Sequence, residues 1–345
     1  MNEVIAPLLL TIAIPTWNRA DFLALNLERL ALEAPEVWHR AEILVSDNAS
    51  ADGTQHVVMD AIASGLPVRY LRNVENIGSD ANIAQCFNLA RGNFVLILGD
   101  DDLLVDGALS ALLERLALND YGVVCMKPYG FEKDFRKEYP GTFGSEKAFD
   151  NAGLFLAAIG PLMTLISSCV ISKKLLPNID ARQFCGDNLV QVHLVLRAAL
   201  AAKHNLFMDR YLIGCQRNNS GGYDFSQVFV TNLGAVLDSC KPAGLSEGAI
   251  HGIENRFLLA YYPFYLLRQR MSRSGDLDAT LARFERRFHG RLLFSYWVAP
   301  ILRLPRPLGI VWGGVATLIG RVFQGDLRRG IAFAWNRLLH GARQR

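Results

Sequence analysis

Residues 94–104 read FVLILGDDDLL, where five apolar residues lead through one glycine into three consecutive aspartates, Asp100, Asp101 and Asp102. An apolar run of this length predicts a short strand that is buried on both faces, as in a parallel sheet. Three adjacent carboxylates repel one another unless a positive charge lies among them. Hard divalent cations prefer oxygen ligands, and Mg²⁺ commonly binds one or two carboxylates together with substrate phosphates. The stretch therefore predicts a strand end that holds Mg²⁺ or Mn²⁺ with a phosphorylated ligand.

The pattern of a short strand followed by a helix recurs through the first 126 residues. Apolar runs at 8–14, 42–46, 67–72, 94–98 and 121–126 alternate with segments that repeat apolar residues at helical spacing. Such alternation predicts βαβ units, and hence an α/β fold with a mainly parallel central sheet flanked by helices. In that architecture ligands bind at the carboxyl ends of the strands.

Polar residues follow each of the first four predicted strands. The segments are 15–22 (PTWNRADF), 46–54 (SDNASADGT), 73–82 (NVENIGSDAN) and the aspartate triplet. Any one of them is explained by a capped turn, because Asp, Asn and Ser favour turns and helix starts. Four in succession favour a shared binding crevice. Neither a Walker A sequence nor a GxGxxG fingerprint is present, so we expect the metal to hold the phosphates.

The motifs TIAIPTWNRADFL, EILVSDNASADGT, NIGSDANI and FVLILGDDDLL occur in this order and spacing. Together they resemble the nucleotide-sugar domain of family 2 glycosyltransferases, over about residues 8–220. The GDDD form with NIG and AN upstream is similar to the abequosyltransferase-like subgroup of O-antigen assembly. The resemblance implies a Rossmann-like GT-A fold, a nucleotide-sugar donor and transfer of the sugar, with inversion, to a saccharide acceptor in lipopolysaccharide or other cell-surface polysaccharide biosynthesis.

The resemblance also implies roles for particular residues. Pro15 and Thr16 match the loop that touches the nucleotide, and Asp47 matches the aspartate that hydrogen-bonds the base. Arg217 is a candidate partner of the diphosphate, although a plain surface arginine explains it equally well. The candidate donor-binding set is Pro15, Thr16, Arg19, Asp47, Asn76, Asp80, Asp100 and Arg217.

The register of the metal motif, often Asp-x-Asp in the family, stays open. Aligning the flanking leucines puts Gly99 at the first acidic position and makes Asp101 the main ligand, with Asp100 toward the ribose and Asp102 supporting. A literal match to the triplet makes Asp100 and Asp102 the ligands instead. We favour Asp101.

The resemblance places the catalytic acid of the family in FCGDNLVQVHL (184–194), where Gly186 replaces a first acid and Asp187 remains. We expect Asp187 to be the general base that deprotonates the acceptor hydroxyl. The alternative is that Asp187 caps a helix over 188–202, and the two roles are compatible. His193 lies on the apolar face of that helix and is predicted to be a core histidine.

The end of the chain differs in charge from the rest. From Arg256 onward there are 16 arginines, no lysine and four acidic residues, interleaved with aromatic and aliphatic side chains. The longest uncharged run, 307–320, is shorter than the roughly 20 residues that span a bilayer. This pattern favours amphipathic helices on an anionic membrane surface, in keeping with a polyprenyl-linked acceptor; a helical bundle or an oligomer contact is the alternative. Nucleic acid is a poor partner, because the arginines lie among large apolar residues.

The predicted organisation is a GT-A catalytic domain over 1–225, with a nucleotide-sugar half at 1–126 and an acceptor half at 127–225. A helical, Arg-rich region follows over 226–345. We expect a cytoplasmic enzyme that is peripheral on the cytosolic face of the inner membrane. The six scattered cysteines favour reduced thiols and argue against zinc.

Two other functions compete with the glycosyltransferase. A Mg²⁺-dependent phosphohydrolase of the haloacid dehalogenase type also carries Asp-x-Asp after a buried strand. However, that motif lies on the opening strand and continues to Gly-Thr, whereas here it follows the fourth strand and continues Leu-Leu. The other alternative is a catalytically inactive membrane-bound scaffold of the same fold.

Overall fold

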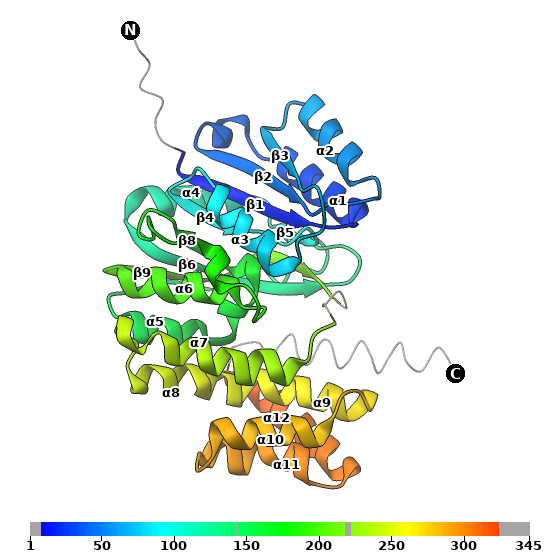
Figure 1. The fold of residues 1–345 in the computed structure, drawn as a ribbon, viewed down its shortest axis with the longest axis vertical. Helices are drawn as coiled ribbons and strands as arrows, with labels where there is room; N and C mark the ends of the chain where they lie inside the picture. The colour runs from blue at the N-terminus through cyan, green and yellow to red at the C-terminus, as the bar shows by residue number, and fades with distance from the viewer. Residues whose placement is uncertain (1–7, 142–143, 218–221, 324–345) are drawn as a thin grey trace. The chain divides into compact units, whose positions relative to one another are not determined.

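The computed structural model describes residues 8–141, 144–217 and 222–323. The chain divides into two compact units, one of residues 1–222 with 239–245 and one of residues 223–238 with 246–345 (Figure 1). Residues 324–345, the end of the predicted Arg-rich region, lie outside the described residues.

The first unit is built on a nine-stranded mixed sheet. The order is β3-β2-β1-β4-β8-β6-β9-β5, and β7 also pairs with β9. Strands β1 to β4 are parallel to one another, β8 is antiparallel to both β4 and β6, and β6 is parallel to β9. The bounds are β1 Leu10–Thr16, β2 Ala41–Asp47, β3 Val68–Arg72, β4 Phe94–Ile97, β5 Asp102–Leu104, β6 Tyr121–Phe131, β7 Glu146–Phe149, β8 Cys169–Ser172 and β9 His204–Gln216.

Helices cover the sheet because the apolar runs of its central strands present buried side chains on both faces. Leu10, Ile12 and Ile14 of β1 join one core with the apolar residues of α1, α2 and α4. Ala13 between them is equally buried, and α3 packs against β1, β2 and β4. The helices of this unit are α1 Ala20–Ala31, α2 Thr54–Ala63, α3 Ser79–Leu89, α4 Ala108–Leu118, α5 Ala152–Ile159 and α6 Val190–Ala201. The predicted α/β class with a mainly parallel sheet is confirmed.

The later strands of the sheet are less regular than the first four. Strand β8 is short, because a 3₁₀ turn at Gly160–Thr164, which contains Pro161, and a second turn, Ile166–Ser168, precede it. Strand β9 is long and pairs with β6 in irregular register. Strands β5 and β7 were not predicted, since one has three residues and the other is largely exposed.

The second unit is helical. It contains α7 Leu233–Ser239, α8 Glu247–Arg256, α9 Tyr262–Ser272, α10 Leu277–Phe288, α11 Ala299–Arg303 and α12 Arg306–Phe323. Glycines let α12 approach α9 closely: a Cβ on Gly320 would lie 2.7 Å from the carbonyl oxygen of Leu259, in the segment that leads into α9. Among the residues that the structure describes, no helix is both long and apolar enough to cross a membrane.

Gly92 marks a close approach between the start of β4 and β1. A Cβ at this position would lie 2.6 Å from the backbone carbon of Leu10, which neither strand can relieve without moving. We expect Gly92→Ala to lower the free energy of unfolding by about 1–3 kcal/mol, as other overpacking substitutions do. Chemical denaturation of the purified protein measures this change.

Gly53→Ala is the matched control, because a Cβ there meets only Ala20 at an ordinary 3.7 Å. Equal effects of the two substitutions on the unfolding midpoint would contradict the proposed clash.

Candidate functional site

The carboxyl ends of β1, β2 and β4 are bound to one another by side chains. Thr16, the last residue of β1, donates its hydroxyl to Asp100 Oδ2 at 2.8 Å. Beyond β1, the Asn18 amide donates to Ser50 Oγ, and Asn18 Oδ1 accepts from the Ala51 amide in the loop after β2. The predicted convergence of the first strand ends is therefore present, and the aspartate triplet lies within it.

The three aspartates have different surroundings. Asp100 is buried, and its Oδ1 lies 3.3 Å from Arg19 Nε. Asp101 is the more open of these two, with 16% of its side chain exposed, and its Oδ2 lies 2.9 Å from Arg19 Nη2. Asp102 belongs to β5, is buried, and accepts a short hydrogen bond from the Ser167 hydroxyl. Of the triplet, Asp101 is therefore the least buried carboxylate.

Burial dominates the protonation of the two enclosed carboxyls. It raises the pKa of Asp100 to about 6, against the lowering effect of Arg19 and of the Thr16 hydroxyl. Burial, followed by the charge of Asp101, raises the pKa of Asp102 to about 7, while Ser167 and Cys215 act in the opposite direction. Both carboxyls thus hold their protons more tightly than an exposed aspartate, and added positive charge would favour their ionised forms.

The carboxylate oxygens of the aspartate triplet suit a hard cation that is held jointly with phosphate oxygens. Within the described parts of the chain, no three Asp, Glu, His or Cys side chains are arranged to hold a metal ion by themselves. Instead, Arg19 contributes the positive charge beside Asp100 and Asp101. One or two carboxylates completed by substrate phosphates is the usual Mg²⁺ arrangement, so the residues present fit a metal that arrives with its ligand.

Asp47 lies at the end of β2 as predicted, but its side chain has no exposed surface. Its oxygens accept from the Tyr70 hydroxyl at 2.6 Å and from the Ser50 amide at 2.8 Å, and Arg72 Nε lies 3.5 Å away. Burial, followed by the hydrogen bond to Asp47, raises the pKa of Tyr70. Asp47 therefore orders this strand end, and Arg72, which the sequence reasoning missed, is the exposed member of the group.

Asn76 and Asp80 lie in and after the loop that follows β3. Asn76 Oδ1 accepts from the Gly78 amide and from the Asn48 side chain, so it holds the loop. Asp80 Oδ2 accepts from the amides of Gly186 and Asn188 at 2.7 and 3.0 Å. These two amides flank Asp187, so Asp80 holds the predicted catalytic residue beside the start of α3.

A cavity of about 330 Å³ lies at this junction. Its lining residues are Ile77, Gly78, Ser79, Asp80, Ala81, Cys185, Gly186 and Asn188. Gly186 has φ +112°, a conformation that L side chains rarely adopt, which explains why glycine replaces the acid expected at this position.

The helix expected over 188–202 begins instead at Val190, with Leu189 as its N-cap. Asp187 Oδ1 accepts from the Leu189 amide at 2.9 Å, so Asp187 closes the turn before the helix and is not its N-cap. Asn188, with φ 62°, lies between Asp187 and the N-cap residue Leu189.

His193 was predicted to be a core residue, but it contacts Asp187. Its Nε2 lies 2.8 Å from Asp187 Oδ2, and its Nδ1 lies 3.2 Å from Arg197 Nη1. Because a guanidinium only donates, Nδ1 accepts from Arg197, and the proton on Nε2 is donated to Asp187. The ring stacks on Phe184 with centroids 4.5 Å apart. No sequence periodicity signals this pair, because the two residues lie on opposite sides of a helix start.

Arg217 lies just beyond β9 and interacts with residues at the end of β6. Its Nη2 donates to the Gly130 carbonyl at 2.8 Å, and Nη1 lies 3.5 Å from Glu132. These contacts favour the plain structural role over a diphosphate partner. The adjoining residues 218–221 lie outside the described residues.

Comparison with known proteins agrees with this geometry. The sequence model described as glycosyl transferase family 2 matches residues 11–175. Abequosyltransferase RfbV of Salmonella typhimurium is 34% identical over 113 residues. The Campylobacter jejuni GalNAc(5)-diNAcBac-PP-undecaprenol beta-1,3-glucosyltransferase is 32% identical over 107 residues. These alignments span 30% and 31% of this chain, and 32% and 34% of the relatives, so the chain matches about a third of each relative's length.

Solved structures share the fold. S. aureus TarS 1-349 in complex with UDP-GlcNAc superimposes with a TM-score of 0.62 at 16% identity, over 92% of this chain and 93% of that one. Mannosyltransferase PcManGT from Pyrobaculum calidifontis, in complex with GDP-Man and Mn²⁺, gives 0.51 at 16% identity over 93% and 89%. Neither the fold nor the sequence match supports the phosphohydrolase or the inactive scaffold. Residues 11–175, just under half of this chain, are thus similar in sequence to glycosyl transferase family 2.

Proposed function

We propose that this chain is a metal-dependent glycosyltransferase that moves a sugar, with inversion, from a nucleotide-sugar donor to a saccharide acceptor. One observation carries the proposal. Asp101 follows β4, and the turn that contains Asp187 is held by Asp80 at the start of α3, the helix that follows β3; strands β3 and β4 run in the same direction, which supports a shared site at their carboxyl ends. A charged group for the leaving diphosphate and a base for the acceptor are the two parts that this transfer requires.

The donor seat is formed by the ends of β1 and β4. Asp101 is the main metal ligand, with Asp100 beside it, because Arg19 and Thr16 hold these two toward the same edge. Asp102 takes a supporting role beneath them through Ser167. When bound, Mg²⁺ or Mn²⁺ would neutralise the charge that develops on the departing nucleoside diphosphate. Pro15 and Thr16 line the nucleotide side, and Asp47 acts on the base indirectly by placing Arg72.

Asp187 is the general base. As the acceptor oxygen bonds to the anomeric carbon, the bond from that carbon to the diphosphate oxygen breaks, and the hydroxyl proton passes to the Asp187 carboxylate. About a quarter of the Asp187 side chain is exposed, which leaves it accessible to an acceptor. His193 is a positioning residue, because its Nε2–H fixes one carboxylate oxygen.

The acceptor is proposed to be polyprenyl-linked, in cell-surface polysaccharide or O-antigen synthesis, with the chain peripheral on the cytosolic face of the inner membrane. The Campylobacter jejuni relative is named for a PP-undecaprenol compound. In the second unit, α12 exposes an apolar stripe of large side chains spaced three and four residues apart: Leu308, Val311, Val315, Leu318 and Val322. A helix with such a stripe and flanking arginines suits an anionic membrane surface.

The metal role is tested with Asp101→Asn. We expect Mn²⁺ to strengthen binding of one nucleoside diphosphate from a panel of UDP, GDP, CDP and dTDP. The variant should lose about tenfold or more of that enhancement, because it removes a charged oxygen ligand. Calorimetric titration with MnCl₂ and with EDTA measures it. Asp60→Asn, on the exposed face of α2, is the control. An unchanged Mn²⁺ dependence in the Asp101 variant would exclude this ligand.

The base role is tested with Asp187→Asn. We expect sugar transfer to fall by about 10²–10⁴-fold, the usual contribution of a general base. Binding of the nucleoside diphosphate should persist, since Asp187 does not touch the donor in this proposal. Incorporation of radiolabelled sugar into extracted membrane lipids, with the donor chosen from the binding panel, is the assay. A variant that loses donor binding to the same degree would make Asp187 structural.

The positioning role is tested with His193→Phe, which keeps an aromatic ring against Phe184 but removes the hydrogen bond to Asp187. We expect kcat to fall about tenfold to a hundredfold, because a misplaced catalytic group loses alignment. The KM for the donor and the melting temperature should stay near those of the parent protein. A fall in melting temperature with unchanged kcat would assign His193 to the core alone.

A further inference from the structure

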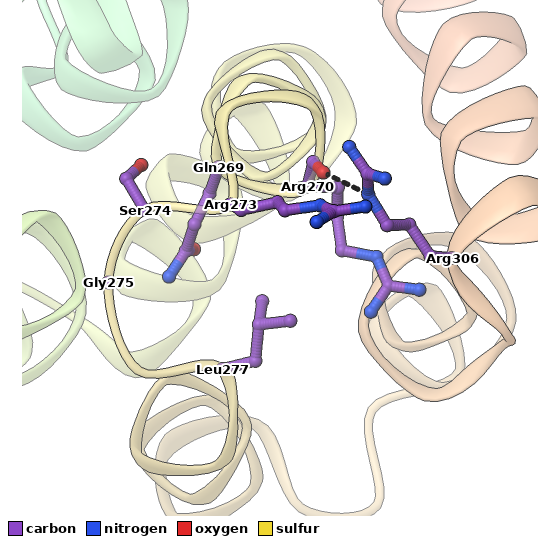
Figure 2. Close-up of a pocket in the computed structure, with 7 residues that line it drawn as sticks. All are labelled: Gln269, Arg270, Arg273, Ser274, Gly275, Leu277 and Arg306. Atoms are coloured by element: carbon purple, nitrogen blue, oxygen red, sulfur yellow. Dashed lines mark hydrogen bonds between the residues drawn. The ribbon is translucent and has the colours of Figure 1, made fainter.

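Three arginines of the second unit, Arg270, Arg273 and Arg306, line a cavity of about 150 Å³. Figure 2 shows their side chains meeting between the end of α9 and the start of α12, with Leu277 below them. At about 30 Å³ per water the space corresponds to roughly five water molecules. Its other lining residues are Gln269, Ser274, Gly275 and Leu277, so no carboxylate lines it.

Arg270 is the enclosed member of this arginine cavity. The residue is 7% exposed, and its Nη2 donates to the Leu304 carbonyl at 2.6 Å. Its Nε is buried, and within the described part of the chain it has no hydrogen-bond acceptor. A buried charged donor without an acceptor loses its hydration and gains nothing in return, which makes such an atom costly. A negatively charged group bound in the adjoining cavity would offset part of this cost through its charge.

Arg306 and Arg273 bring further charge to the same place. Arg306 donates from Nε and Nη2 to the carbonyls of Arg270 and Met271, each at 3.0 Å, and so closes the end of α9. Arg273 is exposed and has φ 55°, at a helix end where glycine or asparagine is usual. Among the residues described, no carboxylate forms an ion pair with any of these arginines.

A phosphate group is the ligand that best matches this group of arginines. Planar guanidinium groups match phosphate oxygens in geometry and retain their charge at all physiological pH values. One phosphate would offset the repulsion among the three arginines. The surroundings favour the phosphate of a membrane lipid over a free phosphate ion, because the apolar stripe of α12 begins at Leu308, two residues after Arg306. Met271, whose carbonyl Arg306 binds, is also exposed.

We propose that the arginine cavity binds the phosphate group of a membrane lipid, with the apolar stripe lying along the adjoining acyl region. The site deepens the membrane association proposed above. It rests on that association and not on sugar transfer, so the two are tested separately.

The experiment uses the full chain and the variant Arg273→Gln, which removes one charge from the cavity and leaves the bonds of Arg270 and Arg306 in place. Arg286→Gln is the matched control, because Arg286 is exposed on α10 and does not line the cavity. Co-sedimentation with phosphatidylcholine vesicles, with and without phosphatidic acid, tests the lipid phosphate. Calorimetric titration with inorganic pyrophosphate in EDTA tests the free ion.

We expect Arg273→Gln to weaken binding to the phosphatidic acid vesicles about tenfold relative to Arg286→Gln. A parallel loss of pyrophosphate binding would support the phosphate site and show that it also takes the soluble ion. A difference seen only with pyrophosphate would overturn the lipid assignment. Equal binding by the two variants in both assays would overturn the site. Failure of the parent protein to bind any vesicle would reject the membrane association, while sugar transfer would remain open to its own assay.

Discussion

Two carboxyl groups buried beyond the end of β4 constrain the edge of the sheet where the first strands end. Removing a carboxylate from water costs several kcal/mol unless it is paired or hydrogen-bonded. Asp100 and Asp102 meet this requirement with Thr16, Arg19 and Ser167, which come from β1, the residue before α1 and the turn before β8. Three segments far apart in the sequence must therefore come together before the aspartates can be enclosed. Asp101 between them is left facing outward because its neighbours are fixed.

Hydrogen bonds between distant segments also connect the two halves of the first unit. Asp80, at the start of α3, accepts from backbone amides more than a hundred residues later, and so holds a turn that contains two residues with positive φ. Such backbone conformations cost free energy and persist only where other contacts impose them. A side chain first considered for donor binding thus becomes the reason that Asp187 has a defined position. His193, packed on Phe184, completes the restraint from the helix side.

The sequence was sufficient for the strands with long buried runs, since β1, β2 and β4 owe their form to local apolar pattern. It was also sufficient for the edge at which polar residues gather, because parallel strands end together. It could not assign Asp102, whose partner Ser167 lies 65 residues away, nor the burial of Asp47 beneath Tyr70. The role of His193 depended on a helix starting at Val190 and not at 188, a shift that no periodicity resolves. Strand β7 could not be predicted, because an edge strand with exposed side chains has no apolar pattern in its sequence.

In helix α12 small residues face the rest of the second unit and large residues face outward, which is the reverse of the usual distribution. Gly313 and Gly320 lie on the face that packs within the second unit, while the large aliphatic residues point outward. Glycines that pack closely bury little apolar area. Most of the apolar area of α12 is therefore still exposed on its outer face, and covering that face would contribute about 25 cal/mol per Å². In water without amphiphile, we expect copies of the chain to cover these faces against one another, so that added detergent would shift the protein toward smaller assemblies.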